Sequence, residues 1–116
     1  MSMSRTKGKE AEDKACVFLR ENGFEIIERN FFARYGEIDI IAQKNGILHF
    51  IEVKSASVGA KSGFEPIYNI TPSKIEKLIS TIGFYLSMQN LTQEYCLDAL
   101  IIKGEHIEFV ENITLC

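Results

Sequence analysis

The sequence lacks several features that mark common classes of protein. No apolar run approaches the roughly 20 residues of a membrane span, and the first residues lead into charged positions rather than the apolar core of a signal peptide. The three cysteines, Cys16, Cys96 and Cys116, are odd in number and far apart, which argues against a disulfide framework or a zinc knuckle. We therefore expect a cytoplasmic protein with no membrane partner, whose cysteines are buried, reduced thiols.

Familiar catalytic motifs are also missing. The sequence has no glycine-rich phosphate loop, no serine-nucleophile motif and no internal repeat. Its only histidines, His49 and His106, have no metal-ligand spacing to a partner, and we interpret both as non-catalytic. The chain has 116 residues, 46% of them hydrophobic and 25% charged, which is typical of one globular domain over residues 1–116.

The net charge of −3 does not by itself suggest a nucleic-acid partner. The charge is unevenly distributed, because Lys103 is the only basic residue after Lys77 whereas five acidic residues follow Lys77. If a metal ion neutralised the acidic residues of the first part, the face that they occupy would be positive. The distribution therefore permits a phosphate-containing partner without demonstrating one.

Two apolar segments, residues 36–42 and 47–55, flank a short polar break, and the rest of the chain is organised around them. Both are rich in β-branched and aromatic residues. The break contains Asn45-Gly46, a pair favoured in two-residue type I′ turns because both positions need positive φ. We predict an antiparallel hairpin in which Lys44 pairs with Ile47.

In that register Asp39 lies opposite Glu52 and Glu37 lies opposite Lys54, with all four side chains on one face. Like charges opposed at about 5 Å are unfavourable, so the two acids need an explanation. They could share a proton, be solvated, or hold a divalent cation. The adjacent lysine on an otherwise apolar face favours the cation. The residues predicted to face the other way are Ile38, Ile40, Ile51 and Val53.

This constellation resembles the PD-(D/E)xK motif of the restriction-endonuclease-like superfamily, in which an acid and a Glu-x-Lys on neighbouring strands carry phosphodiester hydrolysis. More closely, the chain resembles the YraN-like family of bacterial proteins assigned to that superfamily. The resemblance implies an α/β fold with a restriction-endonuclease-like αβββαβ core, a mixed central sheet flanked by helices. The matching segments are Gly36–Asp39, Phe50–Ser55, Glu12-x-x-Ala15-x-x-x-Leu19, Glu28–Asn30, and Lys74-x-x-Lys77-Leu78 with Tyr85-Leu86.

The resemblance also implies a nuclease that hydrolyses phosphodiester bonds of DNA, whether branched or single-stranded. Asp39 and Glu52 would ligate Mg²⁺ or Mn²⁺ with the Val53 carbonyl, and Lys54 would orient or deprotonate water. Glu12, in the first helix, would help to place an ion. The remaining implied roles are tuning of the lysine by Glu37 and contacts to the nucleic-acid backbone by Arg34, Lys61, Lys74 and Lys77.

Two other functions stay open. Ile38 stands where the motif usually has proline, which favours a nucleic-acid-binding module without catalysis. Ser55-Ala56 stands where the family commonly has an arginine, so one expected phosphate contact is missing. A structural protein with an incidental acid cluster is the third possibility, in which the basic side chains are ordinary solvated charges. A homodimer would let so small a domain cover a duplex.

The remaining elements follow from periodicity and end signals. We predict a helix over 5–22, a strand over 24–30, a connection over 31–35, a loop over 56–70 and strands over 95–103 and 106–110. Thr71 as N-cap and Pro72 as first residue begin a second helix. Asp98 interrupts an apolar strand, and we expect it to make structural hydrogen bonds. The predicted buried side of the second helix comprises Ile75, Leu78, Ile79, Ile82 and Leu86.

Overall fold

The computed structural model describes residues 3–56 and 70–114. Their strands form one sheet in the order β1-β2-β3-β4-β5. β3 and β4 are parallel, and the other neighbouring strands are antiparallel. This mixed sheet with helices confirms the predicted α/β fold. The elements are α1 (Met3–Glu21), β1 (Glu25–Ala33), β2 (Gly36–Lys44), β3 (Ile47–Ala56), α2 (Pro72–Met88), β4 (Tyr95–Lys103) and β5 (His106–Val110).

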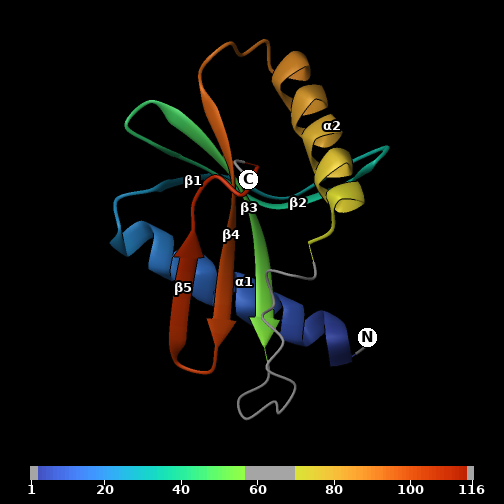
Figure 1. Ribbon diagram of the computed structural model, residues 1–116. Helices are drawn as coiled ribbons and strands as arrows, with labels where there is room; N and C mark the ends of the chain where they lie inside the picture. The colour runs from blue at the N-terminus through green and yellow to red at the C-terminus, as the bar shows by residue number, and fades with distance from the viewer. Residues whose placement is uncertain (1–2, 57–69, 115–116) are drawn as a thin grey trace.

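The two helices pack against different sides of the sheet and so create two apolar clusters (Figure 1). α1 buries Leu19 against a cluster that includes Ile51 of β3. α2 buries Ile82 against a cluster that includes Phe50, the preceding residue of β3. Because successive side chains of a strand point to opposite faces, β3 contributes to both clusters and forms the middle of the core.

The β2–β3 hairpin has the predicted turn and register. Asn45 and Gly46 have φ values of 53° and 78°, as a type I′ turn requires, and Lys44 pairs with Ile47. The ladder extends from that pair to Ile40 opposite Ile51 and ends there. Beyond this point β2 remains paired with β1, and β3 remains paired with β4. The two strands of the hairpin therefore separate immediately before the predicted acidic residues.

This separation corrects two details of the predicted faces. Ile38 belongs to the cluster beneath α2 whereas Ile40 belongs to the cluster beneath α1, so their predicted common face is wrong. Glu37 pairs with Phe32 of β1. Neither the predicted opposition of Glu37 to Lys54 nor that of Asp39 to Glu52 is part of the ladder. The reason is that β2, once separated from β3, follows β1 past α2 and no longer shares the pleat of the central strands (Figure 1).

The first strand is longer than predicted. Residues 31–33, which we predicted to belong to a connection, continue β1, and the chain reverses at Arg34-Tyr35. Phe31 pairs with Ile38, and Ala33 pairs with Gly36. Because neither turn residue is glycine or asparagine, no strong hairpin signal stands at this turn. Pairing with β2 nevertheless extends the strand.

The start of α2 is as predicted, but its buried face is rotated. The Thr71 hydroxyl accepts a hydrogen bond from the backbone N–H of Lys74 at 3.2 Å, and Pro72 occupies the first turn. The prediction for Ile79 is wrong, because that side chain is 40% exposed. Thr81 and Tyr85 are buried instead, since they lie with the confirmed Leu78 and Ile82 on the face toward the sheet.

Two further expectations concern the loop before α2 and membrane spans. Residues 57–69 of the predicted loop over 56–70 lie outside the described residues. Lys61, a predicted site residue, is one of them. Among residues 3–56 and 70–114, no helix combines the length and the apolar composition that crossing a bilayer would need.

Candidate metal and phosphate site

A cleft of about 470 Å³ lies where β2 separates from β3, beside the first two turns of α2. Strand separation opens the space, and the N-terminal part of α2 forms its other wall. Most of the residues that the sequence predicts for the site meet in this cleft. Those in its lining are Glu37, Asp39, Glu52, Val53, Lys54, Lys74 and Lys77.

Asp39 is fixed by the backbone of the neighbouring strand. Its carboxylate oxygen Oδ2 accepts a hydrogen bond from the backbone N–H of Val53 at 2.8 Å. The β2–β3 ladder ends one residue before Asp39, so its side chain takes the place of a strand partner for that N–H. This bond places the Asp39 carboxylate beside Glu52, the residue before Val53.

Glu52 carries the most perturbed carboxyl group of the cleft. Burial raises its pKa most, a hydrogen bond with Asp39 and the charge of Asp39 raise it further, and together they bring it to about 9. Lys54 and Lys74 act in the opposite direction but do not cancel these effects. The metal-free site therefore holds a proton between Asp39 and Glu52 at neutral pH, as in the first of the three alternatives. A divalent cation placed between these carboxyl groups would displace that proton.

Lys54 lies next to another cation. Burial lowers its pKa most, and a hydrogen-bonding contact with Lys74 lowers it further, whereas Glu52 and Asp39 raise it. Its side chain is half-buried. The net lowering makes the neutral amine of Lys54 accessible at a lower pH than that of an exposed lysine.

Glu37 lines the cleft, whereas the predicted site residue Glu12 does not. Burial raises the pKa of Glu37 most, followed by the charges of Asp39 and Glu12. Glu12, on α1, lies 3.5 Å from Arg29 Nη2, which also donates a hydrogen bond of 2.8 Å to Asp13. Glu12 is thus near enough to influence Glu37, but it belongs to an ion-pair network on α1 and β1.

The donors in the cleft suit a small, hard cation. In the described part of the chain, the one trio of His, Cys, Asp or Glu ligand atoms within 4.8 Å of one another lies elsewhere, so Glu12 and Glu37 do not complete a three-ligand set with Asp39 and Glu52. Mg²⁺ is usually bound through one or two carboxylates, with waters and substrate phosphate oxygens completing its coordination. Asp39 and Glu52 supply those two carboxylates.

The two remaining basic residues predicted for the site are Arg34 and Lys61. The Arg34 guanidinium lies 5.5 Å from the ring centroid of Tyr35, and Tyr35 lines the cleft. Arg34 is therefore at the rim, on the exposed turn between β1 and β2. Lys61 lies outside the described residues. Tyr35 was not among the predicted site residues, because nothing in the local sequence distinguishes it from a turn residue.

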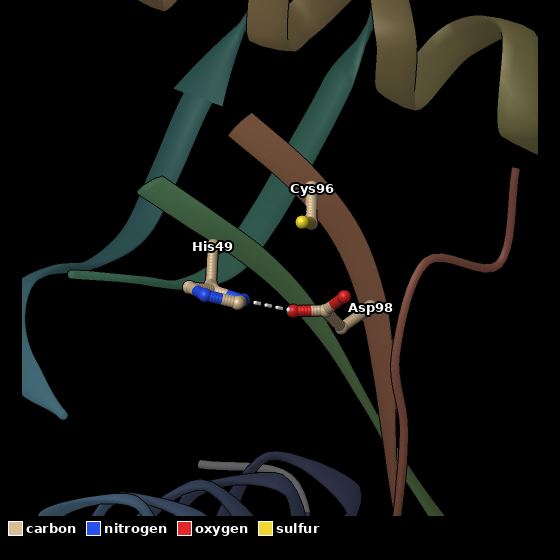
Figure 2. Close-up of side chains that lie close together, drawn as sticks. All are labelled: His49, Cys96 and Asp98. Carbon is tan, nitrogen blue, oxygen red and sulfur yellow. Dashed lines mark hydrogen bonds and ion pairs between the residues drawn. The ribbon is translucent and has the colours of Figure 1, made fainter. Parts of the chain in front are cut away.

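A second polar group lies in the core. Asp98 is fully buried, and its Oδ2 lies 2.6 Å from His49 Nδ1 while its Oδ1 accepts a hydrogen bond from the Asn112 backbone N–H at 2.8 Å (Figure 2). The expectation that Asp98 makes structural hydrogen bonds is confirmed. Sequence spacing missed its partner because the contact crosses the parallel β3–β4 pair, which joins residues far apart in the chain.

Comparison with known proteins places the chain in a family. The model of the uncharacterised protein family UPF0102 matches residues 11–102, which include the hairpin, the cleft and α2. The chain belongs to the UPF0102 family. UPF0102 proteins of Helicobacter hepaticus and Wolinella succinogenes are 69% and 53% identical to it, each over 97% of this chain and 98% and 100% of their own lengths. One from Helicobacter pylori is 56% identical over 95% of this chain and 92% of its own. The expected membership of an uncharacterised bacterial family is thus confirmed.

Proposed function

We propose that this UPF0102 chain is a metal-dependent nuclease that hydrolyses phosphodiester bonds of DNA. The observation that carries the proposal is the meeting of Asp39, Glu52 and Lys54 in one cleft with two further lysines. Resemblance to the PD-(D/E)xK motif supports the same activity. Mg²⁺ or Mn²⁺ held by the two carboxylates would supply a Lewis acid for the phosphate and lower the pKa of a water.

The side chains of the cleft have separate tasks in this reaction. Asp39, anchored to the Val53 N–H, and Glu52 hold the ligand oxygens in fixed positions. Lys54, whose pKa is lowered by burial and by Lys74, is suited to accept a proton from the attacking water and then to stabilise the charge that develops on the phosphate.

The N-terminal end of α2 would hold the DNA backbone. Lys74 and Lys77 lie one turn apart in the first two turns of α2, with exposed side chains that reach the cleft. The positive end of the helix dipole adds to their attraction for phosphate. Arg34, whose guanidinium lies 5.5 Å from the ring centroid of the cleft residue Tyr35, would add a further basic contact.

Cleavage of labelled DNA tests the proposal. Single-stranded, duplex, flapped and branched substrates would be incubated with Mg²⁺, Mn²⁺ or a chelator, using wild type, Asp39→Asn, Lys54→Ala and Lys14→Ala. Lys14 is exposed on α1 and is the matched control for removal of a lysine. We expect metal-dependent cleavage that Asp39→Asn and Lys54→Ala strongly reduce and Lys14→Ala retains. Absence of cleavage with every substrate and metal would refute the nuclease.

The second candidate is a DNA-binding module that binds metal without catalysis. Ile38 at the usual proline position of the motif favours it. It predicts DNA binding that depends on Mg²⁺ and on Asp39, with intact DNA recovered from the complex. The cleavage assay and a binding assay on the same samples therefore separate the two candidates.

A further inference from the structure

A second group of possible metal ligands lies outside the cleft, at the start of the parallel β3–β4 pair. His49, Cys96 and Asp98 each offer one ligand atom, and the three atoms lie within 4.8 Å of one another. His49 is paired with Cys96 across the two strands, and Asp98 is two residues further along β4. Figure 2 shows the three side chains directed toward one region beside these strands. Their arrangement follows from the sheet register rather than from a flexible surface.

We propose that His49, Cys96 and Asp98 bind Zn²⁺, at a site separate from the proposed nuclease centre. An imidazole nitrogen, a thiolate and a carboxylate are all established zinc donors, and the thiolate disfavours Mg²⁺. A thiolate and a carboxylate together carry the two negative charges that balance a divalent cation. Charge balance matters because His49 and Asp98 are only 6% and 0% exposed.

Only small shifts of the three side chains are needed to reach zinc-binding distances. Zinc bonds of about 2.0–2.1 Å to nitrogen or oxygen and 2.3 Å to sulfur place tetrahedral ligands roughly 3.3–3.8 Å apart. His49 Nδ1 and Asp98 Oδ2 are now closer than that, at 2.6 Å, because a proton lies between them. Zinc would replace this proton and the thiol proton of Cys96. Cys96 is partly exposed, which gives an ion access to an otherwise buried pair.

A cavity beside His49 bears on the fourth coordination position. A cavity of about 300 Å³ is lined by both His49 and Glu111. Burial raises the pKa of the Cys96 thiol most, followed by the charges of Asp98 and Glu111, but the exposed Glu111 lies outside the group of ligand atoms within 4.8 Å of one another. The fourth ligand is therefore a water molecule in this cavity, which keeps the charge of the site balanced.

Metal titration of chelator-treated protein tests the site. We expect Zn²⁺ to bind at one equivalent and to raise the melting temperature by roughly 10 °C at about 100 times the dissociation constant. Co²⁺ should give the charge-transfer absorption of a cobalt–thiolate bond. Cys96→Ala should abolish both effects. Glu111→Gln should keep both effects, because Glu111 lies outside the group of three ligands.

Three control variants make the result specific. Cys16→Ala and Cys116→Ala remove the other two thiols and should keep the cobalt absorption and the zinc stabilisation. Asp39→Asn removes a ligand of the proposed nuclease centre and should also keep them, so loss of DNA cleavage and loss of zinc binding are distinguishable. Zinc binding that survives Cys96→Ala, or no binding by wild type, would overturn the proposal.

Discussion

The carboxylate of Asp39 accepts a hydrogen bond from the backbone N–H of Val53 at 2.8 Å, across the point where β2 and β3 part. The bond connects the acid of one strand to the strand that carries Glu52 and Lys54. The relative position of the two acids is therefore set by the backbone, and their repulsion is relieved by a shared proton in the absence of a cation.

Two substitutions of Asp39 should separate its structural role from its metal-binding role. Asn carries no charge but can still accept the hydrogen bond from Val53. Ala carries no charge and cannot accept that hydrogen bond. We expect both variants to lower Mg²⁺ and Mn²⁺ affinity at least about tenfold, because a charged ligand is lost. Only Asp39→Ala should also lose about 1–3 kcal/mol of unfolding free energy, since it leaves a half-buried N–H unpaired. Calorimetric metal titration and urea denaturation measure the two effects.

We expect Lys54 to contribute to cleavage in two ways, as a base in its neutral form and as a positive charge when protonated. Lys54→Ala is expected to lower the cleavage rate by about 10²–10⁴-fold, the usual contribution of a general base. Lys54→Arg keeps the positive charge but stays protonated, so it should bind DNA like wild type and still cleave slowly. Single-turnover cleavage and equilibrium binding check this. Wild-type cleavage by the Arg variant would exclude the base and leave an electrostatic role.

The raised pKa of Glu52 gives metal-free protein a defined pH dependence. An acid whose folded pKa is about 9, against 4.5 when unperturbed, stabilises the fold fully below pH 4.5 and loses this contribution as the pH rises through 9. Glu52→Gln keeps a neutral group beside Asp39. We expect the variant to be more stable than wild type near pH 9 without metal, and to show a flatter profile from pH 5 to 9.

Added Mg²⁺ should make wild type more stable than Glu52→Gln near pH 9. The ion stabilises the ionised form of Glu52, so wild type should gain melting temperature as the pH rises, whereas Glu52→Gln should gain little. Thermal denaturation across this pH range, with and without Mg²⁺, gives the comparison. Identical pH profiles for the two proteins would contradict the assignment of the perturbed carboxyl group.

Lys74 and Lys77 form a matched pair that separates DNA binding from tuning of Lys54. Removing either lysine should weaken DNA binding. It should also reduce the slope of log binding constant against log salt concentration by about 1, which corresponds to one phosphate contact. Lys74 also lowers the pKa of Lys54, so Lys74→Ala should move the rise of the cleavage rate with pH to a higher pH. Lys77→Ala should leave that profile unchanged. Salt-dependent binding and pH-rate profiles of both variants check the distinction.

Asp98 should matter for stability and not directly for cleavage. Its buried carboxylate joins β3, through His49, to the segment after β5, through Asn112. Asp98→Ala leaves both donors unpaired and should cost about 2–4 kcal/mol of unfolding free energy. Asp98→Asn, which retains an acceptor, should cost less, and Glu108→Ala on exposed β5 should be nearly neutral. Urea denaturation of the metal-free proteins measures the series.

Local signals in the sequence were sufficient for much of the fold. The Asn45-Gly46 turn fixes the register of its hairpin because only a few residue pairs accept two positive φ angles. Thr71 and Pro72 begin α2 because they satisfy and pre-form its first turn. These predictions required only interactions between near neighbours.

Features that depend on distant segments were not predictable in the same way. The length of β1 depends on pairing with β2, and the burial of Thr81 rather than Ile79 depends on how α2 rests on the sheet. The same applies to the site. Asp39 and Glu52 could be brought together by a hairpin register, but the approach of Lys74 to Lys54 and of His49 to Asp98 requires the complete tertiary fold.

The two halves of the cleft should form at different times during folding. A hairpin of neighbouring strands closes in microseconds, whereas docking of α2 and parallel pairing of β4 must first close longer loops. The acidic residues of β2 and β3 would thus be gathered before the lysines of α2 arrive to offset their charge. A divalent cation present at that early stage would favour the hairpin, so its presence should accelerate refolding.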